Sequence, residues 1–147
     1  MLLNKSTEHA IRLVLYLTRF QNGNFRRIRE IAEECGVSYF QLGKVAQSLI
    51  KAGILESYTG PHGGVRLTKG RSETRLYDIL EAVEGTDIFE RCVLGFQECG
   101  DVNPCPVHDH WKKARSVISQ LFKERTVEEF VDEEFVEFDS RVFSPKH

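Results

Sequence analysis

The chain has 147 residues with an ordinary apolar content and no low-complexity tract, so one packed domain, or a small domain with an appendage, is feasible. Its formal net charge of −2 is unevenly distributed: residues 1–75 carry 12 Lys/Arg and 6 Asp/Glu, whereas residues 76–147 carry 8 Lys/Arg and 16 Asp/Glu. A basic half joined to an acidic half is typical of a nucleic-acid-binding face backed by an assembly or regulatory region. The apolar run Leu13–Leu17 is short and lacks a cleavage-site pattern, so we expect a cytoplasmic protein without a signal peptide or membrane span.

Three helices are predicted in the first third of the chain. Apolar side chains recur at helical spacing over residues 5–20, over residues 28–35 and from Ser38 to about residue 52. Gly36 is expected to end the second helix as a C-terminal cap. A helix, a glycine-containing turn and a second helix form the pattern of a helix-turn-helix motif.

A short β hairpin is predicted to follow the third helix. Ile54–Tyr58 and Val65–Thr68 have the composition of two strands, and residues 59–64 between them are rich in turn-forming residues. A hairpin at this position is expected to be the wing of a winged helix-turn-helix fold.

The second half of the chain begins with a predicted helix over Leu76–Val83 and continues through a cysteine-containing loop into a long helix. Pro106 suits the first position of that helix, with Cys105 as its N-cap, and the helix reaches about Lys123. Its apolar stripe consists of Trp111, Ala114, Ile118, Leu121 and Phe122. A stripe this long exceeds what a small winged helix can cover, so we expect it to pair with its counterpart in a homodimer.

The end of the chain is acidic. Thr126 and Glu129 have the spacing of a capping box and are expected to open an acidic helix. The pattern as a whole predicts three parts: a DNA-binding domain over residues 1–84, a cysteine loop over residues 85–105, and a dimerisation helix with an acidic segment over residues 106–147.

The start of the third helix carries side chains suited to reading DNA. In a helix-turn-helix protein these residues face base edges in the major groove, and here they are Ser38, Tyr39, Gln41 and Lys44. Gln41 can pair with adenine, and Lys44 can reach guanine or a phosphate. Alternatively, Ser38 and Gln41 only form a capping box, and Tyr39 or Phe40 packs inward.

Basic residues flank this helix. Arg26, Arg27 and Arg29 lie beside the second helix, where DNA phosphates would run, and His62 and Arg66 lie on or beside the wing, within reach of a minor groove. We expect these side chains to bind double-stranded DNA.

Three of the four cysteines, Cys92, Cys99 and Cys105, lie within fourteen residues. Clustered thiolates suit an iron–sulfur cluster, which takes four protein ligands. His108, three residues after Cys105, is one candidate for the fourth ligand, and Glu8, reaching in from a partner subunit, is the other. Each also has a purely structural interpretation, since Glu8 is favoured in a first helical turn by the helix dipole and His108 could be a solvated surface residue.

Other uses of these residues are open. The three loop cysteines could hold zinc with His108, although the usual two- to four-residue knuckle spacing is missing, or two of them could form a reversible disulfide. Cys35 fits a small apolar core position. We do not expect an enzyme with Cys105 as nucleophile, because no positioned base other than His108 accompanies it.

Several stretches carry a family resemblance together: KSTEHAIR at residues 5–12, IREIA at 28–32 with GVS at 36–38, LIKAGIL at 49–55, GPHGG at 60–64 and CPVH at 105–108. Over residues 1 to about 131, the chain resembles the Rrf2 family of bacterial winged-helix regulators, which includes IscR-like and NsrR-like iron–sulfur sensors. The resemblance implies a mainly α fold with a small β wing, a long C-terminal dimerisation helix, and a homodimer on a near-palindromic DNA operator.

The resemblance also implies ligand roles. In cluster-bearing members the loop cysteines ligate iron, which corresponds to Cys92, Cys99 and Cys105 here. IscR-like proteins add a histidine where His108 stands, and NsrR-like proteins add an acidic residue of the partner's first helix where Glu8 stands. We therefore expect a transcription regulator controlled by a 2Fe-2S or 4Fe-4S cluster, with a structural zinc or thiol-redox site as the alternative.

Overall fold

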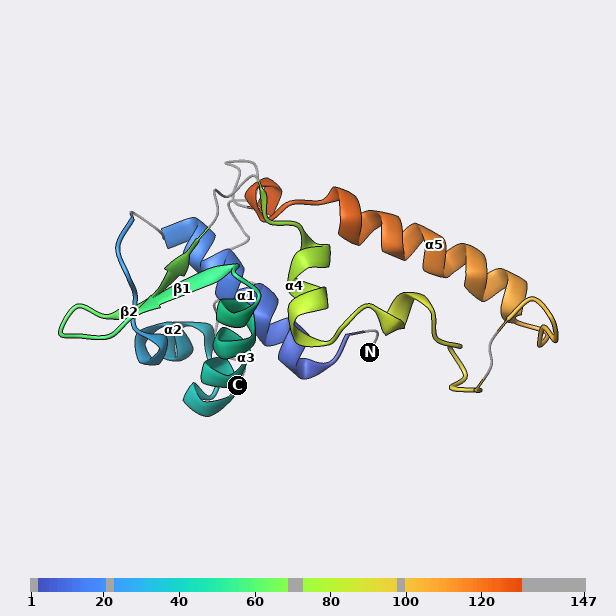
Figure 1. Cartoon of the computed structure of the whole chain (residues 1–147), viewed down its shortest axis with the longest axis horizontal. Coiled ribbons are helices and arrows are strands. Elements are labelled where there is room, and N and C mark those ends of the chain that lie inside the picture. Colours follow the sequence, from blue (N-terminus) through green and yellow to red (C-terminus); the bar gives the residue numbers. More distant parts are fainter. Residues whose placement is uncertain (1–2, 21–22, 69–72, 98–99, 131–147) are drawn as a thin grey trace.

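The protein is represented by a computed structural model, which describes residues 3–20, 23–68, 73–97 and 100–130. The described chain is mainly helical, with one two-stranded antiparallel sheet, so the predicted fold class is confirmed. Figure 1 shows α1, α2, α3 and the sheet gathered at one end of the molecule, while the long helix α5 extends away from them toward the other end.

The helix-turn-helix core consists of α1 (Lys5–Phe20), α2 (Ile28–Cys35) and α3 (Tyr39–Lys51), within a residue of the predicted bounds. Helix α1 packs against α2, α3 and α4, which explains why its apolar face is wide. The largest fully buried side chains of these three helices are Leu13, Tyr16, Leu17, Ile31, Leu42 and Leu49. Burial of such a side chain contributes roughly 1.5–3 kcal/mol, so this cluster is the main source of the domain's stability.

The turn between α2 and α3 depends on glycine. Gly36 adopts the left-handed conformation with φ +66°, and its N–H donates to the carbonyl of Glu33 at 3.3 Å, which confirms the predicted C-terminal cap. Ser38 occupies the N-cap position of α3, but its side chain makes no capping hydrogen bond in the described structure. The predicted capping box with Gln41 is therefore wrong; both residues are exposed, where solvent can satisfy the first backbone N–H groups.

The wing consists of β1 (Leu55–Tyr58), which begins one residue later than predicted and ends where predicted, and β2 (Gly64–Leu67), which lies one residue earlier than predicted. Leu55 pairs with Leu67 at the base of the hairpin, and Tyr58 pairs with Gly64 near its tip. Leu55, Val65 and Leu67 are buried against the helical core, so one face of the hairpin is anchored, whereas Tyr58 near its tip is exposed.

A backbone contact ties the wing to the segment before α2. The N–H of Arg26 donates to the carbonyl of Val65 at 2.9 Å, and the N–H of Val65 donates back to Arg26 at 2.8 Å. Gly64 lies so close to this segment that a Cβ atom on it would sit 2.1 Å from the Arg26 carbonyl oxygen. Its φ of +147° also disfavours any residue with a side chain, so glycine is required here on two grounds.

A second, smaller core lies under α4 (Leu76–Val83) and the short 3₁₀ helix η2 (Asp87–Phe89). It is built from Leu76, Leu80, Ile88 and Phe122. Phe89 lies at its edge, stacked on Tyr77 with ring centroids 5.9 Å apart. This cluster connects α4 to α5 and thereby joins the winged domain to the rest of the chain.

Helix α5 (His108–Glu124) begins later than predicted. Residues 105–107 form a turn, closed by a hydrogen bond of 3.0 Å from the N–H of His108 to the carbonyl of Cys105. The placement of Pro106 at the first helical position and of Cys105 at the N-cap is therefore wrong; Val107 is the N-cap residue. Cys105 therefore lies outside the helix, three residues before its first residue.

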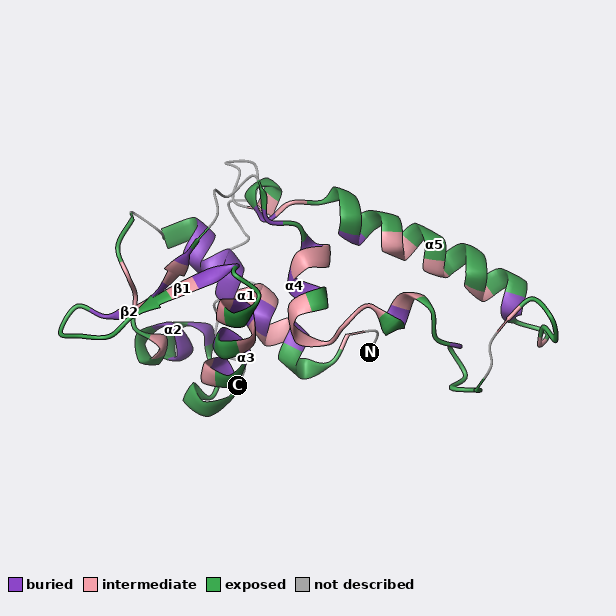
Figure 2. Cartoon of the chain, viewed as in Figure 1, coloured by how far each residue is buried: buried purple, intermediate pink, exposed green. Residues whose placement is uncertain are grey.

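The apolar stripe of α5 is divided between two surroundings. Phe122 is buried and Ile118 packs against the second core, so this chain itself covers part of the stripe that was expected to meet a partner. Ala114, Val117 and Leu121 are exposed, the last two to 68% and 49%. Figure 2 shows most of α5 as exposed surface, with a narrow inner line of partly buried residues.

The described chain ends with the 3₁₀ helix η3 (Val127–Phe130). The carboxylate of Glu129 accepts from the N–H of Thr126 at 3.1 Å, which is one half of the predicted capping box. Val127 is fully buried in the main core. The expected continuation as an acidic helix lies outside the described residues. None of the described helices is long and apolar enough to cross a membrane.

Candidate DNA-binding surface and cysteine loop

The start of α3 is an exposed polar edge. Ser38, Gln41 and Lys44 are all exposed, and the ring of Tyr39 is 47% exposed with the guanidinium of Arg29 5.0 Å from its centroid. Because the opposite face of α3 is buried against α1 and α2, this edge is the part of the helix that can enter a groove.

Phe40 is the residue of this edge that the sequence-based prediction did not assign to DNA. The expectation that it could pack inward is wrong, since its side chain is 79% exposed. It lies two positions before buried Leu42, which places it about 200° around the helix from that residue. An exposed aromatic ring here can make apolar contact with a thymine methyl group. Counting helical positions from Leu42 could have identified it.

Arg26 is directed into the protein. Its guanidinium donates to the hydroxyl of Tyr16 and lies 5.5 Å from the centroid of the same ring. Tyr16 is fully buried, and this burial, reinforced by a hydrogen bond with Glu34, raises its pKa to about 12. Arg26 therefore links the segment before α2, whose backbone pairs with the wing, to α1. This role depends on a contact between two elements, so the presence of a basic residue in the sequence could not reveal it.

Arg66 is held in a similar way. Its guanidinium forms an ion pair with Glu56 on the opposite strand, donates to the carbonyl of Gly23 at 3.0 Å, and lies 4.3 Å from the ring centroid of Phe25. These contacts brace the wing against the loop before α2.

Arg27 and His62 remain on the surface. The guanidinium of Arg27 donates to the carbonyl of Pro61 at 2.8 Å, and His62 is exposed at the tip of the wing. Both line a groove of about 820 Å³ between the wing and the segment before α2, to which Phe25, Tyr58 and Arg66 also contribute. Arg27, His62 and the edge of α3 thus leave one end of the molecule with exposed cationic and hydrogen-bonding groups.

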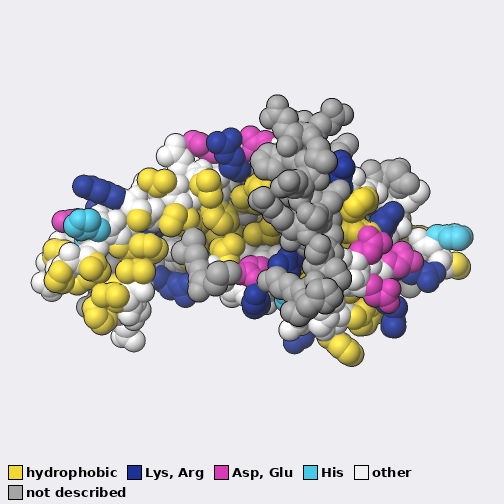
Figure 3. Space-filling model, turned by 180° about the vertical axis from the view of Figure 1, so that it is seen from behind, with side chains coloured by type: hydrophobic (Ala, Val, Ile, Leu, Met, Phe, Trp, Pro, Cys, Tyr) yellow, Lys and Arg dark blue, Asp and Glu magenta, His cyan; other side chains and the backbone are white. Residues whose placement is uncertain are grey.

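The cysteine loop, predicted over residues 85–105, contains the short helix η2 near its start, and the part between η2 and α5 lies at the end of the molecule opposite the wing (Figure 1). Cys92 is buried at 8% exposure and Cys105 is half-buried, whereas Cys99 lies outside the described residues. Large apolar side chains of the same loop are exposed by 53–92%: Val93, Leu94, Phe96 and Val102. Figure 3, seen from behind, shows hydrophobic side chains exposed at this end.

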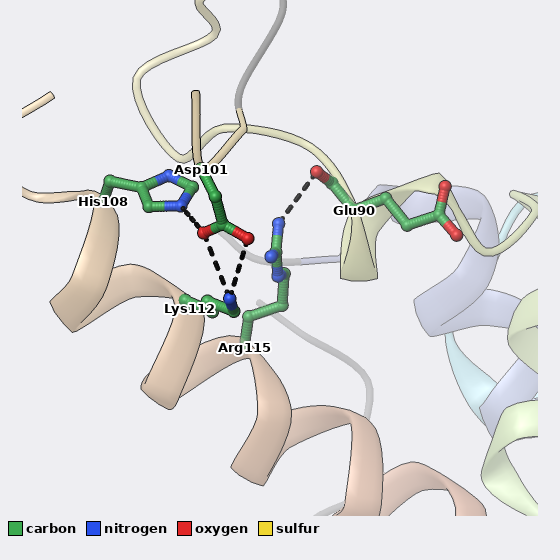
Figure 4. Close-up of polar contacts among 5 residues, drawn as sticks. All are labelled: Glu90, Asp101, His108, Lys112 and Arg115. Carbon is green, nitrogen blue, oxygen red and sulfur yellow. Dashed lines mark hydrogen bonds and ion pairs between the residues drawn. The ribbon is translucent and has the colours of Figure 1, made fainter. Parts of the chain in front are cut away.

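Asp101 joins the loop to α5. One of its carboxylate oxygens lies 3.1 Å from Nε2 of His108, and both oxygens lie 3.1 Å from Nζ of Lys112 (Figure 4). The hydrogen bond to His108, followed by the contact with Lys112, lowers the pKa of the Asp101 carboxyl. The side chain of His108 is only 4% exposed, so the alternative interpretation as a solvated surface histidine is wrong.

The other end of the loop is also attached to α5. The indole of Trp111 donates to the carbonyl of Arg91 at 2.7 Å. The guanidinium of Arg115 donates to the carbonyl of Glu90 at 2.8 Å, as Figure 4 shows. These carbonyls directly precede Cys92. Two turns of α5 thus hold both ends of the loop.

The remaining candidates lie elsewhere. Glu8 is in the first turn of α1, with a carboxylate oxygen 3.0 Å from Nζ of Lys5. Cys35 is buried in the main core, which confirms the predicted core position, and this burial raises its thiol pKa to about 11.

The donors of the loop match a soft metal in type. Thiols and imidazole are the ligands that iron–sulfur clusters and zinc use. Within residues 3–20, 23–68, 73–97 and 100–130, no three His, Cys, Asp or Glu side chains are gathered around one point that could hold a metal ion. Cys92 directly follows Arg91, whose carbonyl accepts from Trp111 of α5, and Cys105 and His108 lie just before and at the start of that helix, while Glu8 is on another helix.

Three helices, a two-stranded wing and an exposed edge on the second helix of the motif define a winged helix-turn-helix protein. The chain belongs to the Rrf2 family, whose profile, described as that of an iron-dependent transcriptional regulator, matches residues 3–133. It is therefore a transcription regulator of a DNA-binding family, and its relatives are regulators rather than enzymes.

Two relatives illustrate the similarity in sequence. Protein aau3 of Rhizobium meliloti (strain 1021) is 33% identical over 133 residues, which cover 89% of this chain and 85% of the relative. The HTH-type transcriptional regulator NsrR of Shouchella clausii (strain KSM-K16) is 27% identical over 132 residues, 89% of either chain.

Solved structures share the fold. CymR, the global cysteine regulator of B. subtilis, has a TM-score of 0.74 at 17% identity, covering 88% of this chain and 95% of that one. T. potens IscR has a TM-score of 0.67 at 18% identity, covering 85% and 82%. At these identities the similarity concerns the fold alone.

Proposed function

We propose that this regulator is a homodimer that binds a double-stranded DNA operator and whose affinity is controlled by an iron–sulfur cluster, 2Fe-2S or 4Fe-4S, on the cysteine loop. The observation that carries the proposal is a loop with three clustered cysteines that is attached at both ends to the long helix α5. The three predicted parts of the chain correspond to reading DNA, binding the cluster and pairing the subunits.

The DNA-binding part of the proposal is supported by the exposure of Ser38, Tyr39, Gln41 and Lys44 and by Arg27 and His62 on the neighbouring wing. Arg26 and Arg66 support the surface from within, because the guanidinium of Arg66 braces the wing and that of Arg26 ties the segment before α2 to Tyr16 of α1. Binding by such a surface should weaken steeply with salt, since phosphate neutralisation releases counterions. A Lys44→Ala variant that bound a selected operator as tightly as the wild type would argue against this surface.

The proposed ligands are Cys92, Cys99 and Cys105, with His108 or the Glu8 of a second subunit as the fourth. When bound, an iron–sulfur cluster supplies one-electron redox chemistry at a centre that responds to oxidants. The protein chain itself contributes the coupling between the cluster-binding loop and the dimerisation helix. Trp111 and Arg115 attach one end of the loop to α5, so the order of the loop and the position of α5 are coupled.

The dimer part of the proposal rests on α5. Its outer line of Ala114, Val117 and Leu121 is exposed and apolar, at the usual three- and four-residue steps of a helical stripe. Pairing of two such helices places the two recognition helices in a fixed relation, which is what a near-palindromic operator requires.

Anaerobic purification with iron and sulfide quantification tests the cluster directly. We expect a coloured protein with charge-transfer absorption, and a difference in operator affinity between the loaded and the metal-stripped forms. A colourless protein containing zinc would instead favour the structural-zinc alternative, and equal operator affinity of the two forms would refute control by the cluster. Cys92→Ser is expected to abolish iron binding, with Cys35→Ser as the matched control in the core.

A further inference from the structure

Asp101 lies in the cysteine loop, seven residues before His108, and contacts the start of α5 in two places. Its Oδ1 atom is 3.1 Å from Nε2 of His108, and both carboxylate oxygens are 3.1 Å from Nζ of Lys112 (Figure 4). The side chain of Asp101 is 73% exposed, whereas that of His108 is 4% exposed. An exposed carboxylate therefore holds a buried imidazole.

The chemistry of the pair determines which ring nitrogen carries hydrogen. A carboxylate beside the ammonium group of Lys112 is ionised at neutral pH, and an ionised carboxylate can only accept hydrogen bonds. Nε2 of His108 must therefore be the donor. In the neutral ring, the lone pair then belongs to Nδ1, because a neutral imidazole has one protonated nitrogen and one acceptor nitrogen.

We propose that Asp101 is a positioning residue, which holds His108 with Nε2 protonated and thereby makes Nδ1 the nitrogen that ligates iron. Histidines that bind metals commonly donate their second ring N–H to a carboxylate, which fixes the ring orientation and strengthens the ligand. The inference rests on the proposed function and deepens it, since it favours His108 over Glu8 as the fourth ligand. Lys112 assists by holding both oxygens of Asp101 in place.

The structural half of the inference is tested without metal. In apo protein labelled with ¹⁵N-histidine, we expect an Nε2–H proton signal from His108 that is protected from exchange with water. Asp101→Ala should lose this protection. Asp101→Asn should retain part of it, because an amide oxygen can still accept the bond. Asp109→Ala is the matched control, since it removes the same charge from the exposed neighbour of His108 and should leave the signal unchanged.

The functional half is tested by competing anaerobically loaded protein against an iron chelator. Removal of a carboxylate that supports a ligating histidine typically weakens metal binding by roughly 10–100-fold, so we expect a loss of that size in Asp101→Ala and none in Asp109→Ala. Pulsed electron paramagnetic resonance of the reduced, ¹⁵N-labelled protein should show coupling to one histidine nitrogen, which His108→Ala abolishes.

The outcomes separate the two proposals. An Nε2–H signal that is absent from the wild type, or unchanged in Asp101→Ala, would overturn the positioning role whatever metal the protein holds. Wild-type protein without iron would overturn the proposed function and, with it, the ligand role of His108. Iron retained in His108→Ala but lost in Glu8→Ala would assign the fourth ligand to Glu8 and overturn the inference alone.

Discussion

The contact between the wing and the segment before α2 predicts a severe effect for Gly64→Ala. The added Cβ atom would lie 2.1 Å from the carbonyl oxygen of Arg26 and 2.9 Å from the nitrogen of Arg27, both of them backbone atoms that cannot rotate away. Strand β2 and the segment before α2 must therefore separate, and the pair of hydrogen bonds between Arg26 and Val65, at 2.9 and 2.8 Å, must lengthen or break.

The expected loss of unfolding free energy in Gly64→Ala is the sum of two contributions. Each lost hydrogen bond costs about 1 kcal/mol, and a side chain forced into an unfavourable φ of +147° costs roughly 1–3 kcal/mol. We therefore expect Gly64→Ala to lower the free energy of unfolding by about 4 kcal/mol, which is a large part of the stability of a small domain. Gly53→Ala is the matched control, because its φ is +80° but no atom lies within 4 Å of the added Cβ. It should cost about 1–2 kcal/mol.

Urea denaturation followed by circular dichroism measures the loss of stability in each of the two variants. Titration of the folded protein with operator DNA shows whether the displaced wing weakens DNA binding. Gly64→Ala should lose the larger amount of stability and, in addition, operator affinity that Gly53→Ala retains. Equal destabilisation of the two variants would refute the argument that close backbone approach, rather than φ alone, demands glycine at Gly64.

Three further outcomes are expected. Phe40→Ala should reduce affinity for an operator selected from random DNA by about tenfold, or about 1.4 kcal/mol, while Gln47→Ala on the same helix should not; equal affinities of both variants would exclude a base contact by Phe40. Val117→Asp together with Leu121→Asp should shift the protein toward monomer in sedimentation velocity, and an unchanged dimer would place the interface elsewhere. Because burial raises the pKa of the Cys35 thiol from 9.0 to about 11, the neutral thiol stabilises the fold below pH 9 and this contribution declines as pH rises from 9 to 11. Cys35 should accordingly resist alkylation at pH 8 until urea unfolds the protein, and rapid labelling of the native protein would contradict its burial.

Local patterns were sufficient for the helices and the hairpin. The bounds of α1, α2 and α3 follow from apolar spacing, and the cap at Gly36 follows from the left-handed conformation that glycine adopts readily. Local patterns failed at the capping box of Ser38 and at the start of α5. Both errors concern helix N-termini, where the first backbone N–H groups have no partner within the helix and the sequence does not specify what satisfies them.

The functional side chains likewise divide into those that could be predicted from the sequence and those that required the structure. The clustering of the loop cysteines and the winged helix-turn-helix pattern could be predicted from the sequence, because both depend on spacing along the chain, whereas the role of transcription regulator followed from the resemblance to the Rrf2 family. The packing of the elements was needed to show that Arg66 braces the wing, that Arg26 ties the segment before α2 to α1, that Phe40 is exposed, and that Asp101 contacts His108. The arginine and aspartate contacts join separate elements, and the exposure of Phe40 depends on which face of α3 packs against the core. Their geometry depends on how the elements pack, which residue spacing alone does not encode.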